Sequence, residues 1–88
     1  MIRLVIDGKA VTDMDALHDL FARELDLPEW YGRNLDALYD CLTDPGPEVE
    51  IVLENQETLL ENLGLGYWRL VRMLADAAEE SRRIHFLV

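Results

Sequence analysis

Three short apolar segments, spread over the whole chain, constrain the fold more than any other feature of the sequence. They lie at residues 2–6, 49–53 and 83–88. Their length and β-branched content predict strands. Long connections separate them, as the crossovers between parallel strands require. We therefore expect an α/β fold with a three-stranded parallel sheet, and the unbroken run Leu4-Val5-Ile6 predicts burial of both sheet faces.

In both connections between the strands, apolar residues recur with helical spacing, which predicts about four helices. The first starts after Asp13 or Asp15, either of which can cap it, and ends before Pro28. The second runs from about Asn34 to Leu42. The predicted buried stripes are Leu17, Leu20, Phe21 and Leu25 on the first helix and Leu35, Leu38 and Leu42 on the second.

The third and fourth predicted helices, at about residues 56–62 and 67–80, follow the second strand. Asn55 is the expected cap of the third, and Gly64 or Gly66 is expected to end it in the left-handed conformation that glycine tolerates. No repeat or linker interrupts the pattern, so residues 1–88 are expected to form a single domain. The predicted stripe of the fourth helix is Tyr67, Leu70, Val71, Leu74 and Ala78.

Composition argues against several classes of protein. Eighteen acidic residues against eight basic ones give a formal charge of −10, which disfavours binding to nucleic acid or to an anionic membrane surface. No apolar run approaches the roughly 18 residues of a membrane span, and the first residues enter a strand pattern without signal-peptide architecture. Cys41 is the sole cysteine and cannot form an intrachain disulfide. We expect a soluble, monomeric, cytoplasmic protein without a metal or cofactor.

The negative charge is concentrated, since residues 24–50 carry eight acids and a single base, Arg33. Such a concentration steers charged partners. Within it, Asp36 and Asp40 are four residues apart and share one face of the second helix, away from its leucine stripe and toward solvent.

Two interpretations of this acidic face stay open from the pattern alone. It fits an ordinary solvated helix surface, on which like charges four residues apart cost a few tenths of a kcal/mol. It also fits a protein interface, because Trp30, Tyr31 and Tyr39 lie nearby and exposed aromatics beside charges are typical of interface anchors.

Enzymatic chemistry fits the residues less well. Glycoside hydrolysis needs two carboxylates that flank the sugar in a cleft, and Asp36 and Asp40 lie on a convex helix face. Metal binding is also disfavoured, because neither this pair nor Asp13 and Asp15 has calcium-loop spacing or a nearby histidine. His18 and His85 are expected in structural roles, and Cys41 as an inert thiol. Arg82 and Arg83 are expected at a solvated helix end, near the last carbonyls.

Residues 27–43, LPEWYGRNLDALYDCLT, resemble the barstar family, intracellular inhibitors of secreted microbial ribonucleases. The predicted order of strands and helices agrees with that family over the whole chain. The resemblance implies a parallel sheet in the order 1-2-3 and a 1:1 complex in which the second helix and the preceding loop plug the ribonuclease active site.

The resemblance also implies roles for individual residues. Asp40 would stand in for a substrate phosphate, Asp36 would pair with a second donor, and Trp30 would pack on the catalytic histidine. The full set of implied ribonuclease-binding residues is Trp30, Tyr31, Gly32, Asn34, Asp36, Tyr39, Asp40, Thr43 and Asp44.

The chain departs from the family pattern at two places near this surface. The acidic contact on the last helix falls near Ala75 or Asp76, and Ala75 cannot make it. The segment Asp44-Pro45-Gly46-Pro47 replaces an aromatic residue of the family. The expected function is ribonuclease inhibition without enzyme activity. The alternative is an acidic interaction or regulatory domain whose partner is not a nuclease.

Overall fold

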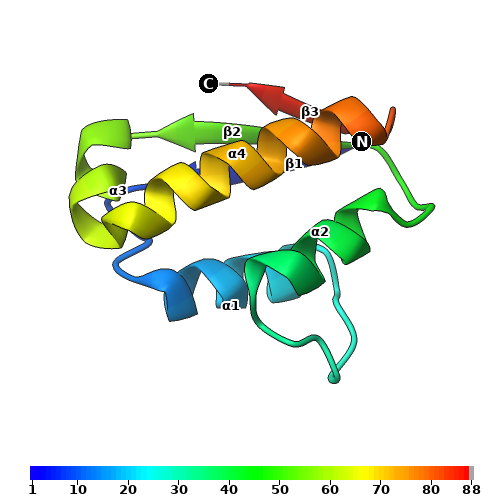
Figure 1. Cartoon of the computed structure of the whole chain (residues 1–88), viewed down its shortest axis with the longest axis horizontal. Coiled ribbons are helices and arrows are strands. Elements are labelled where there is room, and N and C mark those ends of the chain that lie inside the picture. The colour runs from blue at the N-terminus through cyan, green and yellow to red at the C-terminus, as the bar shows by residue number, and fades with distance from the viewer. Residues whose placement is uncertain (88) are drawn as a thin grey trace.

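The computed structural model describes residues 1–87, in which three strands and four helices form an α/β fold (Figure 1). The predicted fold class and element order are confirmed. The expected end of the last strand, Val88, lies outside the described residues. The strands are β1 (Ile2–Asp7), β2 (Val49–Glu54) and β3 (Ile84–Leu87). The helices are α1 (Met14–Glu24), α2 (Leu35–Thr43), α3 (Gln56–Leu63) and α4 (Leu65–Glu80).

The strands form one parallel sheet in the order β1-β2-β3, as the family resemblance implies. β2 is central, so that Val49 lies between Ile2 of β1 and Ile84 of β3. Parallel strands require the chain to return to the same end of the sheet each time. The pair α1 and α2 makes the first return, and the pair α3 and α4 makes the second.

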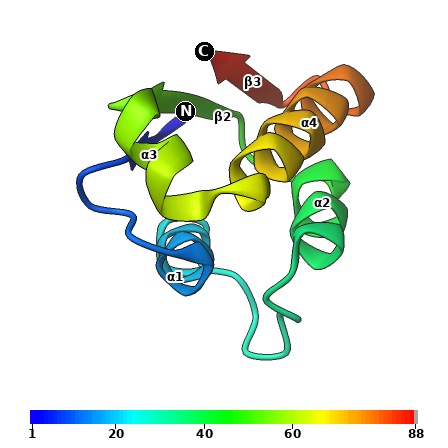
Figure 2. The same cartoon turned by 60° about the vertical axis from the view of Figure 1, so that its left-hand side comes forward.

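Helices cover one face of the sheet, and the other face is more open. Leu4 and Ile6 of β1 are buried, whereas Val5 between them is half-buried, and β2 repeats this alternation. Figures 1 and 2 show α1, α2 and α4 on one side of the sheet and α3 at the end where β2 leaves it. The expectation that both faces are buried is therefore wrong. Two successive crossovers of the usual right hand, in the order 1-2-3, place their helices on the same side.

The starts of α1 and α3 differ in how they are capped. Asp13 caps α1, because its Oδ1 accepts the backbone N–H of Ala16 at 2.8 Å, while Asp15 lies in the first turn. Asn55 precedes α3 with φ at 52°, and its side chain makes no capping bond. Its amide instead donates to Asp7 Oδ1 at 2.7 Å, which ties the start of α3 to the end of β1. The predicted side-chain cap at Asn55 is wrong.

The boundary between α3 and α4 lies at Gly64, with φ at 57° and ψ at −129°. Its positive φ agrees with the expectation, although its ψ lies outside the left-handed helical basin. Gly66 lies inside α4, which begins two residues before the predicted start at Tyr67. The predicted stripe of α4 is shifted, because Val71 and Ala78 are only half-buried. The buried residues are Tyr67, Leu70, Met73, Leu74 and Ala77.

The hydrophobic core fills the space between the helices and the covered sheet face. Its largest fully buried side chain is Phe21 of α1, and the same core contains Leu17, Leu38, Leu42 and Leu70, from three helices, without exposed surface. α2 packs against α4 and thereby becomes the outermost helix at that edge of the fold (Figure 2). Within residues 1–87, no helix combines the length and the apolar character needed to cross a membrane.

Candidate binding face of the second helix

α2 turns its two aspartates away from the core. Leu38 and Leu42 on its inner side have no exposed surface, whereas Asp36 and Asp40 are exposed, as predicted. Asn34 caps the helix, because its Oδ1 accepts a backbone N–H three residues later at 2.7 Å. The cap and the two buried leucines therefore fix α2 with both carboxylates on its solvent side.

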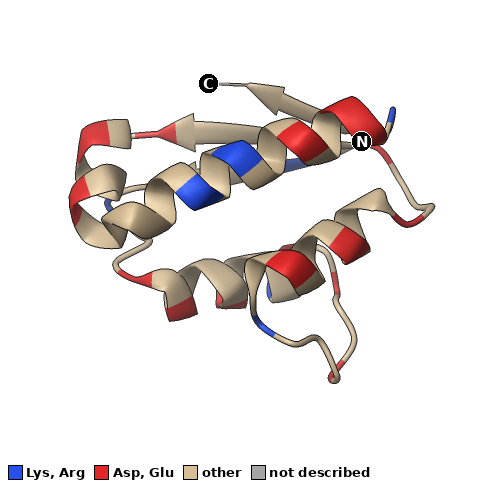
Figure 3. Cartoon of the chain, in the orientation of Figure 1, with Lys and Arg blue, Asp and Glu red and all other residues tan. Residues whose placement is uncertain are grey.

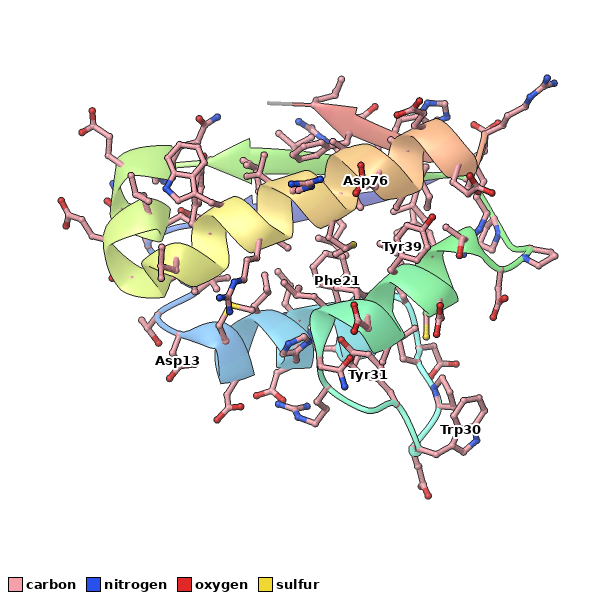
Figure 4. All side chains as sticks on the ribbon, viewed as in Figure 1. Asp13, Phe21, Trp30, Tyr31, Tyr39 and Asp76 are labelled. Carbon is pink, nitrogen blue, oxygen red and sulfur yellow. The ribbon has the colours of Figure 1, made fainter. Side chains whose placement is uncertain are left out.

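The loop before α2 places its two neighbouring aromatic residues in opposite environments. Trp30 is 82% exposed at the tip of the loop, as Figure 4 shows, and Tyr31 is only 6% exposed. The Tyr31 hydroxyl forms a hydrogen bond of 2.5 Å with Nδ1 of His18, which is itself buried in α1. The expectation that both aromatics are exposed is wrong for Tyr31, whose ring fixes the loop to the core.

The buried pair changes the acid–base properties of both side chains. Burial raises the pKa of Tyr31 to about 12. Burial also lowers the pKa of His18, and the positive charge of Arg33 lowers it further. His18 is therefore neutral at pH 7, and its role is structural, as expected.

Arg33 holds the α2 end of this loop against α1. Its Nη2 donates to the carbonyl oxygen of Asp15 at 3.1 Å and lies 2.9 Å from Asp19 Oδ1. The residue has φ at 53°, a left-handed conformation that costs free energy in a residue with a side chain. Asn34 adds a bond from its Nδ2 to the carbonyl oxygen of Gly32 at 3.3 Å. Tyr31, Gly32 and Arg33, which follow Trp30 in the chain, thus hold the loop that carries its exposed indole.

Tyr39 and Thr43 lie at the border between the exposed and buried sides of α2, and both are half-buried. The Thr43 hydroxyl donates to the carbonyl oxygen of Tyr39 at 2.9 Å, so this hydroxyl serves the helix itself. Tyr39 faces α4, where it shares a hollow of about 290 Å³ with Asp76, Glu79 and Glu80. Figure 4 shows Asp76 on α4 above Tyr39 on α2.

A larger hollow, of about 550 Å³, opens between the two loops that flank α2. Trp30 and Asp40 line it, together with Asp44 from the segment that follows the helix. Cys41 also lines this hollow, and burial together with the charges of Asp44 and Asp40 raises the pKa of its thiol. The thiol is therefore protonated at neutral pH, in agreement with the prediction that it is inert.

Arg83 also lines this hollow. Its Nε, Nη1 and Nη2 donate to the carbonyl oxygens of Asp44 at 2.6 Å, Pro47 at 2.9 Å and Cys41 at 2.8 Å. The guanidinium thus binds the last turn of α2 and the proline-containing segment after it. The prediction of a solvated arginine near the last carbonyls of α4 is wrong for Arg83, because the carbonyls it binds belong to α2 and its following loop.

Other chemistry-bearing side chains are scattered. Within residues 1–87, no three His, Cys, Asp or Glu side chains gather where they could hold a metal ion. His85 lies exposed on β3, with its Nε2 3.6 Å from Glu48, and His18 is occupied by Tyr31. Asp40 of α2 and the exposed Trp30 thus border one hollow, whereas the second exposed tryptophan, Trp68, lies on α4.

Comparisons with known proteins identify the family. The family model described as "Barstar (barnase inhibitor)" matches residues 1–88. A protein of Bacillus subtilis (strain 168) described as "Putative ribonuclease inhibitor YrdF" is 38% identical over 81 residues, which cover 91% of this chain and 89% of the relative. The resemblance found in residues 27–43 is thereby confirmed, and the chain belongs to the barstar family.

Proposed function

We propose that this protein inhibits a secreted microbial ribonuclease by forming a 1:1 complex in which α2 and the preceding loop block the active site. The observation that carries the proposal is a pair of exposed aspartates, Asp36 and Asp40, on α2 of a chain of the barstar family. The name of the Bacillus subtilis relative supports the same class of partner.

Asp40 acts as the phosphate mimic in this proposal. Ribonuclease active sites carry positive charge because they bind phosphates, and an exposed carboxylate is complementary to them. Asp40 is exposed, and no ion pair within residues 1–87 involves it, so its carboxylate is available to a partner. The last turn of α2 brings Asp44 to the same hollow and strengthens the negative potential there.

Trp30 packs on the catalytic histidine of the ribonuclease. Its indole is exposed beside the same hollow as Asp40, so an imidazole ring can lie against the indole while its charge faces the carboxylate. Tyr31 contributes by positioning, since its ring is buried. Gly32, Asn34, Asp36, Tyr39 and Thr43 complete the contact surface. The departure at Ala75 is compensated by Asp76, which lies exposed beside Tyr39.

The setting proposed for this activity is the cytoplasm, where the free protein is a monomer. It has no catalytic activity and requires no cofactor. A reduced Cys41 with a raised pKa fits a reducing compartment. The excess of acid over base fits a protein partner rather than nucleic acid.

Calorimetric titration against a panel of small guanyl-preferring microbial ribonucleases, together with an activity assay, tests the proposal. We expect Asp40→Ala to weaken binding more than Asp36→Ala, Trp30→Ala or Tyr39→Ala. Removing one member of a desolvated charge pair costs roughly 2–5 kcal/mol or more, and complexes of barstar-family proteins are among the systems from which such values are known. Thermal stability should stay unchanged or rise slightly, because Asp40 lies where the helix dipole does not favour an acid.

Glu57→Ala and Glu61→Ala are the matched controls, because both residues are exposed acids on α3, away from this surface. Their effect on affinity should stay below about threefold. Absence of binding to every ribonuclease of the panel would favour the alternative of a non-nuclease partner. Parent-like binding by Asp40→Ala, or a loss explained by unfolding, would contradict the phosphate-mimic role.

A further inference from the structure

The groove between α2 and α4 carries two arginines that the proposed inhibitory face does not use. Arg69 and Arg72 are exposed on α4, three residues apart, and therefore lie on the same side of that helix. Both line a hollow of about 340 Å³ with Asp36 and Tyr39 of α2. Arg69 also lines a neighbouring hollow of about 540 Å³ at the start of α2, beside Arg33.

These two guanidinium groups have no acidic partner in the described part of the chain. The arginines that form ion pairs within residues 1–87 are Arg3, Arg23 and Arg33, and Arg83 is occupied by carbonyl oxygens. Asp36 lines the same hollow as both free arginines, yet it is not paired with either. In a protein with a net charge of −10, two neighbouring unpaired arginines leave a local site that attracts an external anion.

The sign of the charge reverses along this groove. The first half of α4 carries Arg69 and Arg72, and the second half carries Asp76, Glu79 and Glu80, as the blue and red segments of α4 in Figure 3 show. The positive dipole end of α2, at its N-terminus, lies at the arginine end of the groove. The groove therefore offers a basic half beside Asp36 and an acidic half beside Tyr39.

We propose that Arg69 and Arg72 bind a carboxylate-bearing segment of the ribonuclease, next to the cationic active site that receives Asp40. The inference rests on the proposed function and adds a determinant of partner choice to it. A guanidinium pairs with a carboxylate through two parallel hydrogen bonds, so the pair favours an acidic group in a defined position. A ribonuclease that is uniformly basic around its active site meets repulsion here, and one with an acidic segment gains a contact.

Charge reversal tests the inference. Arg69→Glu/Arg72→Glu is compared with Arg23→Glu/Arg82→Glu, which changes the net charge equally at exposed residues of α1 and of the turn after α4. If the added negative charge acts only at long range, both variants bind a basic ribonuclease as tightly as the parent or more tightly. If the arginines contact a carboxylate, the first variant loses at least about tenfold in affinity, since like charges in contact are costly. The control should stay within about threefold of the parent.

The outcomes separate this inference from the proposed function. A parent protein that binds no ribonuclease overturns both. A parent that binds, with Arg69→Glu/Arg72→Glu binding at least as tightly as the control, overturns the inference alone. The exposed acidic residues of the bound ribonuclease are then replaced by lysine, one at a time. One of these replacements should restore tight binding by Arg69→Glu/Arg72→Glu, and absence of any rescue also overturns the inference. Circular dichroism checks the fold, and Arg69→Gln/Arg72→Gln replaces the variant if the charge reversal unfolds it.

Discussion

At the scale of single residues, Asp36 and Asp40 show how identical side chains on one helix face acquire different surroundings. Asp36 lies in the first turn of α2, where the helix dipole favours an acid and two arginines of α4 are near. Asp40 borders the hollow that Asp44 also lines, where Arg83 is already bound to carbonyl oxygens. The helical period predicts that both point to solvent. The positions of the two aspartates along the helix and the presence of Asp44 can also be read from the sequence. The nearness of the two arginines to Asp36 cannot, because they come from α4, about 30 residues further along the chain.

Tyr31 marks the limit of prediction from neighbouring residues. The dipeptide Trp30-Tyr31 indicates aromatic residues in a loop, and nothing in the pair says which ring is exposed. The deciding partner, His18, lies 13 residues earlier on α1. A histidine beside the buried stripe of a helix needs a hydrogen-bond partner, which is the one sequence signal that points to a buried hydroxyl or carbonyl.

The pair of His18 and Tyr31 predicts a dependence of stability on pH. The pKa of His18 is lower in the folded protein than the ordinary value of 6.5, because burial disfavours the imidazolium. Its contribution to stability is therefore complete above about pH 6.5 and is lost as the pH falls through the lowered folded value. We therefore expect protonation of His18 to lower the free energy of unfolding as the pH falls below about 6.5. Urea titrations at pH 7.5 and at lower pH measure this decrease.

His18→Gln supplies the control, since glutamine can bond to the Tyr31 hydroxyl but does not titrate in this range. Acid unfolding has contributions from many carboxyl groups, and these are shared by both proteins. The difference in stability between parent and variant should therefore shrink as the pH falls. A constant difference would contradict the assignment of this titration to His18.

At the scale of elements, hydrophobic periodicity predicts where the helices lie along the chain. It fails to predict which residues of a helix are buried where that helix packs against several neighbours. The sequence predicts the positions of α1 and α2, because each has one apolar stripe facing one core. Of the predicted stripe residues, Leu20, Leu25 and Leu35 are only half-buried. α4 contacts α2, α3 and β3, so its buried arc includes Met73 and Ala77 rather than Val71 and Ala78. Residues with similar hydrophobicity on adjacent faces cannot be ranked without knowing these neighbours.

Arg83 illustrates an interaction between elements that no local pattern predicts. It precedes β3, and it binds carbonyl oxygens at the end of α2 and in the loop after it, about 40 residues away. Gly46 allows this approach, because a Cβ at that position would lie 3.1 Å from the guanidinium carbon. The positive charge also compensates the negative dipole end of α2, where Asp40 and Asp44 add negative charge.

We predict that Arg83→Met destabilises the protein and weakens ribonuclease binding. Methionine keeps an apolar stem but removes three donors, and losing hydrogen bonds from a charged group costs roughly 1.5–3 kcal/mol. The segment from Asp44 to Pro47 then loses the hydrogen bonds that hold it. Because this segment lines the same hollow as Trp30, the shape of that hollow is expected to change. Urea unfolding and calorimetric titration measure the two effects.

Arg82→Met provides the comparison, because Arg82 is exposed and carries the same charge one residue earlier. Its stability should stay within about 0.5 kcal/mol of the parent. Equal stability of the two methionine variants would show that the bonds of Arg83 are replaced by water without cost, and would remove its role in holding α2.

At the scale of the whole molecule, the fold places α2 and its two flanking loops at one edge, and contacts from other elements hold both loops in place. α1 holds the loop before α2 through His18 and through the carbonyl and carboxylate that bind Arg33. The turn before β3 holds the loop after α2 through Arg83. The parallel order of the strands is what brings these distant segments together. That residues 1–88 form a single domain remains a prediction.

The concentration of charge around α2 predicts that association depends on salt. Residues 24–50 hold eight acids and one base, so the proposed ribonuclease-binding face lies in the most acidic segment of the chain. Such fields raise association rates by about 10- to 1,000-fold at low ionic strength. The screening length falls from about 30 Å at 0.01 M salt to about 8 Å at 0.15 M. We therefore expect the association rate to fall at least about tenfold over this range.

Stopped-flow fluorescence can follow this association, with Trp30 as the reporter in a Trp68→Phe background. Trp68 lies on α4, so its removal leaves one indole, at the proposed contact. The dissociation rate should change much less than the association rate, because contacts within the formed complex are screened little once water is excluded. Asp36→Asn/Asp40→Asn should give a shallower salt dependence than the parent. Association rates that are equal at low and high salt would mean that the acidic segment does not steer the ribonuclease, and that its charges act only after contact or not at all.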